Sequence, residues 1–215
     1  MNTLDCNQDA PAQFAASGGS ASRSKFKTIV ADPPWAVKQP PKAFGAKGNS
    51  PLPYKTMTIA EIKALPVADL ADDVCHLYLW TVNKYVRKAY DVAEAWGFRP
   101  TMLLTWCKEP LGDGPGWEYS SATEFVLFCK KGTGEWPRPA KHERKNWWIW
   151  KRGKHSAKPE AFQDMVESVS AGPYLELFAR RARLGWSVWG NEVESNVVLV
   201  PPNAEIRHGG PETHD

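Results

Sequence analysis

The stretch TIVADPPW, residues 28–35, decides how this chain folds and where its chemistry lies. TIVA is a short apolar run with β-branched residues, which favours a buried strand, and Asp32 follows it directly. Pro33 and Pro34 end the strand because they lack backbone N–H donors and have fixed φ angles. Ligands of α/β sheets bind beyond the carboxyl ends of strands, so Asp32 is a candidate site residue.

Segments with strand and helix character alternate along the rest of the chain. Aromatic and aliphatic density predicts further strands at residues 74–81, 101–108, 124–131, 146–150, 174–179 and 186–190. A helix is predicted after Thr58, which forms a capping box with Glu61. Two more helices are predicted at residues 86–96, before the stop at Gly97, and from about Pro159. The alternation predicts an α/β domain with three layers and a mostly parallel central sheet.

The composition is that of one globular domain with polar tails. The chain has 215 residues, of which 42% are hydrophobic and 24% charged, enough for one substantial core. We expect residues 1–24 to be a disordered tail, residues 25–194 to form the domain and residues 195–215 to be a partly disordered extension. No apolar run approaches the roughly 18 residues of a membrane span, and the N-terminus lacks a secretory-signal pattern, so we expect a cytoplasmic protein.

The cysteines give no sign of a structural framework. All four lie far apart, without a Cys-x-x-Cys pair or clustered histidines. The sequence therefore supports neither a disulfide framework nor a zinc site, and we expect no metal. Cys75, Cys107 and Cys129 lie in apolar strand-like runs, where buried inert thiols are expected.

Positive charge is concentrated in one segment. Residues 138–158, RPAKHERKNWWIWKRGKHSAK, contain eight Lys or Arg and one Glu, although the whole chain carries a net charge of only +3. Basic residues interleaved with tryptophans are typical of a nucleic-acid groove, which combines phosphate contacts with base stacking. The candidate contacts are Arg144, Lys145, Trp147, Lys151, Arg152 and Lys154. The alternative is a strand whose tryptophans alternate into the core beneath a solvated run of charges.

The tetrapeptide Asp-Pro-Pro-Trp suits a planar aromatic amine. Asp32 and the Pro33 carbonyl could each accept one amine hydrogen, while the ring of the substrate stacks on Trp35. Two such acceptors would stabilise the positive charge that grows on the nitrogen as it attacks an electrophile. The alternative is structural: Asp32 caps the next element, the prolines turn the chain and Trp35 fills the core.

The chain resembles the MT-A70 family of S-adenosylmethionine-dependent methyltransferases, which methylate the N-6 amine of adenine in RNA or DNA. The resemblance runs from about Phe26 to Val193, and it lies in the ordered blocks VADPPW, LPYKTMTIAEIKALPV, HLYLWTVNKYVRKAYDVAEAWGF, LLTWCK, TEFVLFCKKG, HSAKPEAF and YLELFARRARLGWSVWGNE. The position of the tetrapeptide before the cofactor-binding strand is similar to that in the β class of amino-methyltransferases. The resemblance implies a Rossmann-like methyltransferase fold with S-adenosylmethionine as cofactor.

The resemblance also implies roles for individual residues. The catalytic tetrapeptide would be Asp32, Pro33, Pro34 and Trp35. Cofactor-binding positions would be Asp32, Tyr54, Lys158, Glu176, Arg180, Asn191 and Glu192, with Lys158 near the methionine end and the Asn-Glu pair at the ribose hydroxyls. Glu124 matches a position lining the nucleotide pocket. Ala182 and Arg183 depart from the family, which often has a His-Asn pair touching the ribose there.

The expected function is therefore methylation of adenine at N-6 in nucleic acid, with the target base single-stranded or flipped out. DNA is favoured over RNA because the chain is a bare catalytic domain without a recognisable RNA-targeting module, which suits a small prokaryotic or phage enzyme of specific or relaxed sequence preference. The alternatives are an RNA adenine methyltransferase, a catalytically silent nucleic-acid-binding subunit and methylation of the N-4 amine of cytosine. The sequence leaves open whether the chain forms a homodimer or has a partner subunit.

Overall fold

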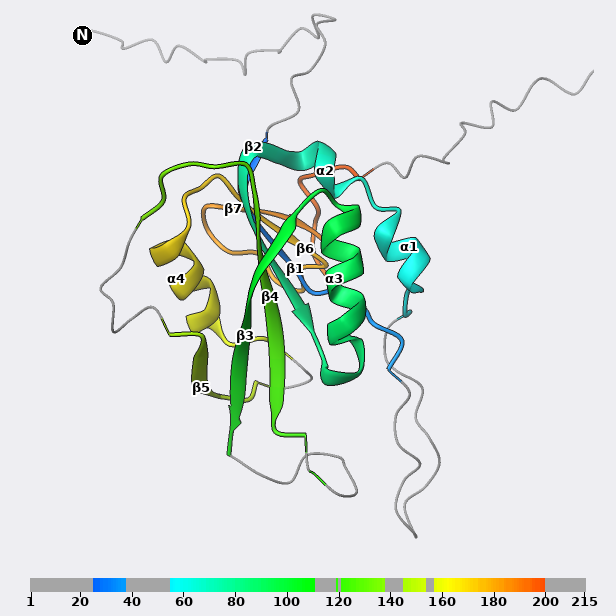
Figure 1. Cartoon of the computed structure of the whole chain (residues 1–215), viewed down its shortest axis with the longest axis vertical. Helices are drawn as coiled ribbons and strands as arrows, with labels where there is room; N and C mark the ends of the chain where they lie inside the picture. The colour runs from blue at the N-terminus through cyan, green and yellow to red at the C-terminus, as the bar shows by residue number, and fades with distance from the viewer. Residues whose placement is uncertain are drawn as a thin grey trace, which may run out of the picture.

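The computed structural model describes residues 25–37, 55–110, 119, 121–137, 145–153 and 157–199 (Figure 1). The strands are β1 (Phe26–Ala31), β2 (Ala71–Thr81), β3 (Arg99–Glu109), β4 (Thr123–Lys131), β5 (Trp147–Lys151), β6 (Tyr174–Leu177) and β7 (Trp186–Trp189). The helices are α1 (Ile59–Lys63), α2 (Val67–Leu70), the 3₁₀ turn η1 (Asn83–Tyr85), α3 (Val86–Ala95) and α4 (Glu160–Val169). Every strand and helix predicted from the sequence is confirmed, whereas α2 and η1 were not predicted.

The seven strands form one sheet in the order β5-β3-β4-β2-β1-β6-β7. β1 pairs in parallel with both β2 and β6, whereas β4 runs antiparallel to β2 and β3. The remaining described pairs, β3 with β5 and β6 with β7, are parallel, which confirms the mostly parallel sheet. After β1 the chain continues to β2, which pairs with one edge of β1, and only later adds β6 to the other edge of β1. A crevice is expected where the strand order reverses in this way.

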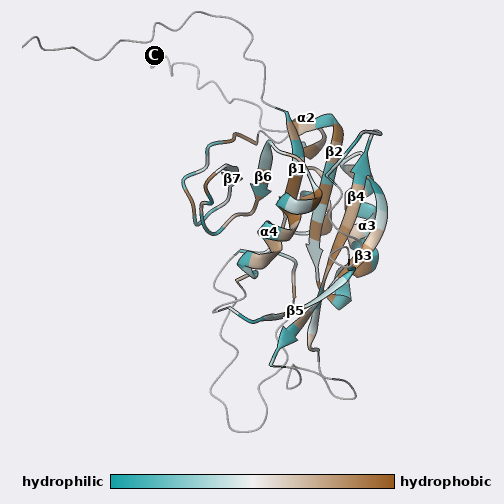
Figure 2. Ribbon diagram, turned by 90° about the vertical axis from the view of Figure 1, so that its left-hand side faces the viewer, coloured by the Kyte–Doolittle hydropathy of each residue, from teal (hydrophilic) through white to brown (hydrophobic). Residues whose placement is uncertain are grey.

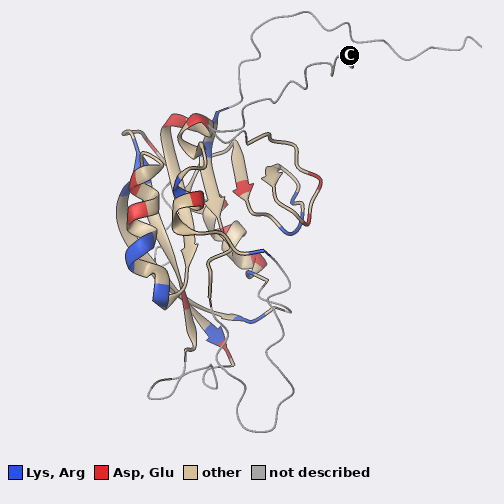
Figure 3. Cartoon of the chain, turned by 90° about the vertical axis from the view of Figure 1, so that its right-hand side faces the viewer, with Lys and Arg blue, Asp and Glu red and all other residues tan. Residues whose placement is uncertain are grey.

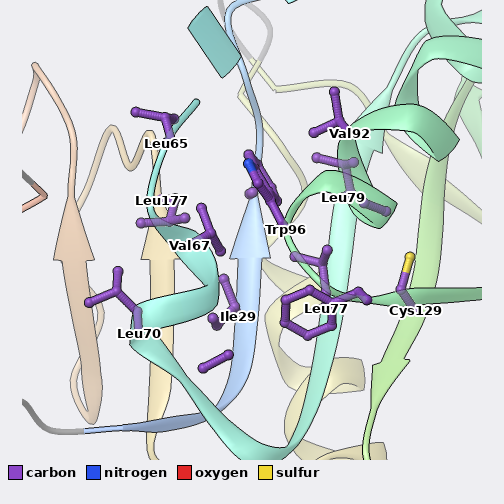
Figure 4. Close-up of a cluster of buried hydrophobic side chains, with 14 of the residues drawn as sticks. Ile29, Leu65, Val67, Leu70, Leu77, Leu79, Val92, Trp96, Cys129 and Leu177 are labelled. Atoms are coloured by element: carbon purple, nitrogen blue, oxygen red, sulfur yellow. The ribbon is translucent and has the colours of Figure 1, made fainter. Parts of the chain in front are cut away.

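Helices cover both faces of the sheet. Figure 2 shows the apolar strands between α4 on one side and α3 on the other, which confirms the three-layer architecture. On the face covered by α1, α2 and α3, the core contains Ile29, Leu77, Leu79, Val92, Trp96 and Leu177 (Figure 4), together with Leu127 and Leu175. On the face covered by α4, the core contains Val30, Tyr78, Trp80, Val126, Phe162 and Val166. Successive residues of β1 and β2 thus point to opposite faces, as expected for buried strands.

Local signals account for the helix ends. Thr58 and Glu61 form the predicted capping box: the Glu61 N–H donates to Thr58 Oγ1 at 3.2 Å, and the Thr58 N–H donates to Glu61 Oε2 at 2.7 Å. α3 ends before Gly97, whose φ of 80° lies in the left-handed region that favours glycine.

The segment after β7 packs on the domain as far as Leu199. The Val188 N–H donates to Asn196 Oδ1 at 2.7 Å, and the Asn196 N–H donates to the Val188 carbonyl at 3.1 Å. Leu199 is buried in the core. The ordered domain therefore continues past the boundary that the sequence suggested at residue 194. Residues 1–24, the predicted N-terminal tail, and residues 200–215, the rest of the predicted extension 195–215, lie outside the described residues.

The described residues contain neither a membrane-spanning helix nor a cluster of metal ligands. No helix in these ranges combines the length and apolarity needed to cross a membrane. In the same part of the chain, no group of three or more His, Cys, Asp or Glu side chains is arranged to hold a metal ion. β1 and β6 end side by side at the carboxyl edge of the sheet, which is where a ligand site is expected in this type of fold.

Candidate active site

The tetrapeptide follows β1 and turns sharply at the carboxyl edge of the sheet. The Trp35 N–H donates to the Pro33 carbonyl at 2.8 Å, and the Met57 N–H donates to the Pro34 carbonyl at 3.0 Å. Each of these two carbonyls therefore already accepts one backbone hydrogen bond. Because a carbonyl oxygen has two lone pairs, each keeps one for a ligand.

Trp35 occupies a different environment from the one that the sequence suggested. Its side chain is only 4% exposed, and its Nε1 donates to the Trp80 carbonyl at 3.0 Å. The indole stacks on Tyr85 with ring centroids 5.4 Å apart. Trp35 is therefore not an open stacking face in this structure, and its indole packs into the core, which was the structural alternative. Partners 45 and 50 positions away decide this placement, so sequence spacing could not reveal it.

Four charged side chains from four parts of the fold form a network beside the tetrapeptide. Lys158 Nζ lies 2.9 Å from Asp32 Oδ2 and 3.0 Å from Glu124 Oε2. Lys108 Nζ lies 2.6 Å from the other oxygen of Glu124. Lys158 precedes α4 and also lies over the Trp80 ring, 4.9 Å from its centroid. One ammonium group thus joins the predicted catalytic aspartate to the predicted pocket glutamate.

The network keeps its central charges ionised at neutral pH. Burial acts to lower the pKa of Lys158, but the carboxylates of Asp32 and Glu124 outweigh burial and raise that pKa above its usual value. Burial acts to raise the pKa of Glu124, but Lys158 and Lys108 outweigh it and hold that pKa below its usual value. Glu124 therefore offers a carboxylate, and not a carboxylic acid, to a ligand.

Glu176, on β6, lies in a different electrostatic environment. Burial is the main cause that raises its pKa to about 7, and the nearby charge of Asp32 adds to the effect. Arg181, Arg183 and Lys158 act in the opposite direction. Gln163 Nε2 from α4 donates to Glu176 Oε2 at 2.6 Å. A carboxyl group that titrates near neutrality in a cleft is typical of a functional site.

Two adjoining cavities meet at this network. The smaller, of about 240 Å³, lies between the ends of β1 and β6 and the start of α4, and its lining includes Trp80, Gln163 and Glu176. The larger, of about 660 Å³, is lined by the tetrapeptide and by Met57, Lys108, Thr123, Glu124, Trp189 and Asn191. Asp32, Lys158, Phe178, Arg180 and Glu192 line both. The structure thus brings together every described residue predicted for catalysis or cofactor binding, whereas Tyr54 lies outside the described residues.

The loops after β6 and β7 form one wall of both cavities. Phe178 follows β6 directly with a φ of 62°, a left-handed conformation that is uncommon for a bulky residue and is found where the backbone must turn sharply. Gly190, directly after β7, lies against Ala179, which follows Phe178. A Cβ added to Gly190 would be 2.1 Å from the Ala179 carbonyl oxygen. Only glycine lets the two loops approach so closely.

Arg183 is directed away from the cavities. Its Nε donates to Glu167 Oε1 at 3.0 Å, and its Nη2 donates to Asp164 Oδ1 at 2.6 Å, both on α4. It lines neither cavity. At this position, where the sequence departs from the family that it resembles, the side chain therefore joins α4 to the loop after β6 and does not face the cavities.

The basic aromatic segment divides its tryptophans between surface and core. Trp148 and Trp150 stack on each other, with centroids 5.2 Å apart, and pack against the core on the α4 face. Trp147 is 47% exposed, and Lys145 Nζ lies 5.6 Å from its ring centroid. The alternative of tryptophans packed against the core thus holds for Trp148 and Trp150, whereas Trp147 is open to solvent and its contact with nucleic acid stays a prediction. The period-two alternation of a strand could have predicted the division, but not which face is covered.

The positive charges of this segment lie at the outer edge of the sheet. Lys145, Lys151 and Arg152 are exposed, and among the described residues no ion pair joins them to a carboxylate. Figure 3 shows basic residues at the end of the sheet where β3 and β5 end. Lys108, near the end of β3, also lines the larger cavity. The other two predicted contacts, Arg144 and Lys154, lie outside the described residues.

Sequence reasoning missed two residues of the site. Gln163 interrupts the apolar face of α4 between Phe162 and Val166, and a buried polar residue in such a face signals a specific partner. Lys108 carries no comparable signal, because a lysine at the end of a strand is usually solvated. Only the fold, which places it beside Glu124, reveals its role.

Known proteins are similar to this chain over most of its length. The profile of the MT-A70 family matches residues 26–192. The type II methyltransferase M.MunI from Mycoplasma sp is 33% identical over 200 residues, which are 86% of this chain and 84% of that protein. The human N(6)-adenosine-methyltransferase catalytic subunit METTL3 is 23% identical over 200 residues, and the human N(6)-adenine-specific methyltransferase METTL4 is 25% identical over 194 residues. The chain spans only 30% and 38% of these two human proteins.

Proposed function

The chain belongs to the MT-A70 family of methyltransferases, and we propose that it transfers a methyl group from S-adenosylmethionine to the N-6 amine of adenine in DNA. One observation carries the proposal: a single lysine holds two carboxylates, Asp32 and Glu124, at the boundary of two adjoining cavities. Two substrates that exchange a methyl group need two such compartments that meet at the reacting atoms.

The smaller cavity has the chemistry that the cofactor requires. S-adenosylmethionine, when bound, supplies a methyl group made electrophilic by a positive sulfonium. Lys158 would bind the methionine carboxylate, and the acidic side chains of Asp32 and Glu176 suit the positive groups of the same ligand. Glu192, which lines both cavities, and Asn191, which lines the larger cavity beside it, would bind the ribose hydroxyls, with Arg180 next to Glu192. These side chains thus suit a ligand that combines a positively and negatively charged amino-acid part with a sugar.

The larger cavity would hold the target adenine. Asp32 and Glu124 would each accept one hydrogen of its amine and stabilise the positive charge that develops as the N–C bond forms and the C–S bond breaks. The nitrogen would then lose one of these hydrogens as a proton, through one of the two carboxylates to solvent. The second lone pair of the Pro33 carbonyl is a further acceptor. The buried indole of Trp35 would act through position, because its hydrogen bond to Trp80 fixes the turn that carries these acceptors. A base that reaches this cavity must be unpaired or flipped out.

The exposed face of β5 would bind the flanking polymer. Lys145, Lys151 and Arg152 suit phosphates, and the open ring of Trp147 suits a stacked base. DNA is favoured because the chain covers most of the length of M.MunI, which is named a type II methyltransferase. We assign the methyltransferase domain to residues 25–199.

The test measures methyl transfer with the full chain, labelled cofactor, and single-stranded and duplex DNA or RNA, followed by mass spectrometry of the digested products. We expect N-6-methyladenine in DNA, and a loss of at least about 100-fold in rate for Asp32→Asn, which keeps the shape of the side chain but halves its acceptors. Asp91→Asn, on the exposed face of α3, is the matched control and should retain the rate. Full activity of Asp32→Asn would refute the mechanism, and methylcytosine or methylated RNA alone would refute the assigned substrate.

A further inference from the structure

Gln163 lies where an uncharged polar side chain needs a specific reason. It is 4% exposed, on the face of α4 that also buries Phe162 and Val166. Its Nε2 donates to Glu176 Oε2 at 2.6 Å, and its Oε1 accepts from Arg181 Nη2 at 3.2 Å. Both ends of the buried amide therefore have partners, which satisfies the group in the core.

The partners fix which way the amide points. A guanidinium group can only donate hydrogen bonds, so Arg181 requires the oxygen of Gln163 on its side. The amide nitrogen is left facing Glu176, to which it can only donate. Arg181 is itself held by an ion pair with Glu160 at the start of α4. Glu160 thus holds Arg181, Arg181 orients Gln163, and the amide nitrogen of Gln163 donates to the carboxyl group of Glu176.

The charges around Glu176 come from every element packed against it. Asp32 follows β1, Lys158 precedes α4, and Arg181 and Arg183 lie in the loop after β6. Arg180 and Glu192 line the same cavity from the loops after β6 and β7. Burial and Asp32 raise the pKa of Glu176 to about 7, so the group is close to half protonated at neutral pH. A bound cation and the Gln163 donor both favour its ionised form.

We propose that Glu176, oriented by Gln163 and Arg181, is the anionic site for a positive group of the cofactor, and that cofactor binding expels a proton from Glu176 into solvent. The inference rests on the proposed function, because it assumes that S-adenosylmethionine occupies the smaller cavity. A neutral acid offers little attraction to a cation, whereas a carboxylate in a partly desolvated site attracts it strongly. By linkage, a ligand that prefers the carboxylate binds more tightly as the pH rises and releases a proton as it binds.

The expected size of the effect follows from this linkage. If the ionised form alone binds, affinity is about tenfold weaker at pH 6 than at pH 8, and about half a proton is released per cofactor at pH 7. Gln163 and Arg181 are positioning residues in this scheme, since they act through Glu176. Removing either one disfavours the carboxylate, so the pH midpoint of affinity should move upward while the shape of the curve is kept.

The experiment is isothermal titration calorimetry on the full chain, between pH 6 and pH 8.5, in two buffers with different ionisation enthalpies. The probes are S-adenosylmethionine, which has both a sulfonium and an ammonium, and S-adenosylhomocysteine, which has only the ammonium. Proton release with both probes would identify the ammonium as the partner of Glu176, and release with S-adenosylmethionine alone would identify the sulfonium. Either result supports the proposal.

Three variants and one control separate this site from general effects. Glu176→Gln should abolish the proton release, and Gln163→Leu should move the midpoint upward. If Gln163→Leu fails to fold, Arg181→Met tests the same link from a half-exposed position. Glu94→Gln removes an exposed carboxyl group on α3 and should leave the pH dependence unchanged.

Two outcomes would overturn the inference, and they are distinguishable. Tight binding of S-adenosylmethionine without proton release, or with the same release in Glu176→Gln, would overturn the role of Glu176 and leave the proposed function standing. Absence of binding of either probe at any pH would overturn the proposed function together with the inference.

Discussion

Replacing Lys158 by Met tests the centre of the site. The substitution keeps an unbranched side chain over the Trp80 ring and removes the ammonium group that lies 2.9 Å from Asp32 and 3.0 Å from Glu124. Glu124 keeps its ion pair with Lys108 at 2.6 Å. Asp32 loses the ion pair that the structure gives it among the described residues. The variant therefore leaves one carboxylate without a cation and another with half of its partners.

The magnitude follows from the burial of the network. A hydrogen bond to a charged group contributes about 1.5–3 kcal/mol to stability, and the variant loses two of them, to Asp32 and to Glu124. Because the methionine carries no charge, the variant also avoids the free energy needed to desolvate the ammonium group, which offsets part of this loss. The Lys158 side chain is 19% exposed, so solvent screens the interaction only in part. We expect the free energy of unfolding to fall by about 1–3 kcal/mol. Loss of the contact to the methionine carboxylate should weaken cofactor binding by about 10-fold to 100-fold.

Urea denaturation followed by circular dichroism measures the first effect, and calorimetric titration with S-adenosylmethionine measures the second. The matched control is Lys88→Met, which breaks an ion pair with Asp91 on α3 whose lysine is 53% exposed. Such an exposed pair contributes about 0.5 kcal/mol or less, and it lies outside both cavities. Equal stability of the two variants, with equal cofactor affinity, would refute the reasoning and make Lys158 one more solvated lysine of a basic segment.

Two further predictions test the outer edge of the sheet and the wall of the cavities. Lys151→Gln combined with Arg152→Gln should reduce the salt dependence of DNA binding, with a change of about 1.5 in the slope of log K against log salt, and should leave cofactor affinity intact; an unchanged slope would remove β5 from the proposed DNA path. Gly190→Ala should lower stability and cofactor affinity together, because its Cβ would lie 2.1 Å from the Ala179 carbonyl oxygen. Its control, Gly185→Ala, has open space and should cost only the left-handed conformation, about 1–2 kcal/mol, so equal losses in both would contradict the packing argument.

Much of the fold could be predicted because its signals are local. A capping box, an apolar run or a glycine stop involves residues a few positions apart, and Thr58, Glu61 and Gly97 act as their chemistry requires. The environment of Trp35 could not be predicted in this way, because its partners, Trp80 and Tyr85, are brought to it by the folding of other segments. A tryptophan after a strand is compatible with an open stacking face and with a core, and the sequence alone does not choose.

In the candidate site too, the identity of the residues could be predicted from the sequence, but their electrostatic environment could not. Family resemblance placed Lys158, Glu124 and Glu176 by matching motifs, and the structure gathers them around Asp32. Their electrostatics were out of reach, because each depends on a contact between distant segments. Glu124 is held below its usual pKa by two lysines from other elements, whereas Glu176 is raised to about 7 by burial. The pKa values of two glutamates in one site are thus shifted in opposite directions.

The direction of one strand explains how a single lysine can serve both cavities. Because β4 is antiparallel, its first residues lie at the edge where its parallel neighbours end: Thr123 pairs with Cys107 near the end of β3. Glu124 therefore reaches the carboxyl edge from the start of a strand, while Asp32 reaches it from the end of β1. The segment before α4 passes over this edge and carries Lys158 between the two acids. A parallel β4 would place Glu124 at the opposite edge of the sheet, so the antiparallel strand is a requirement of the proposed chemistry and not an incidental feature of the fold.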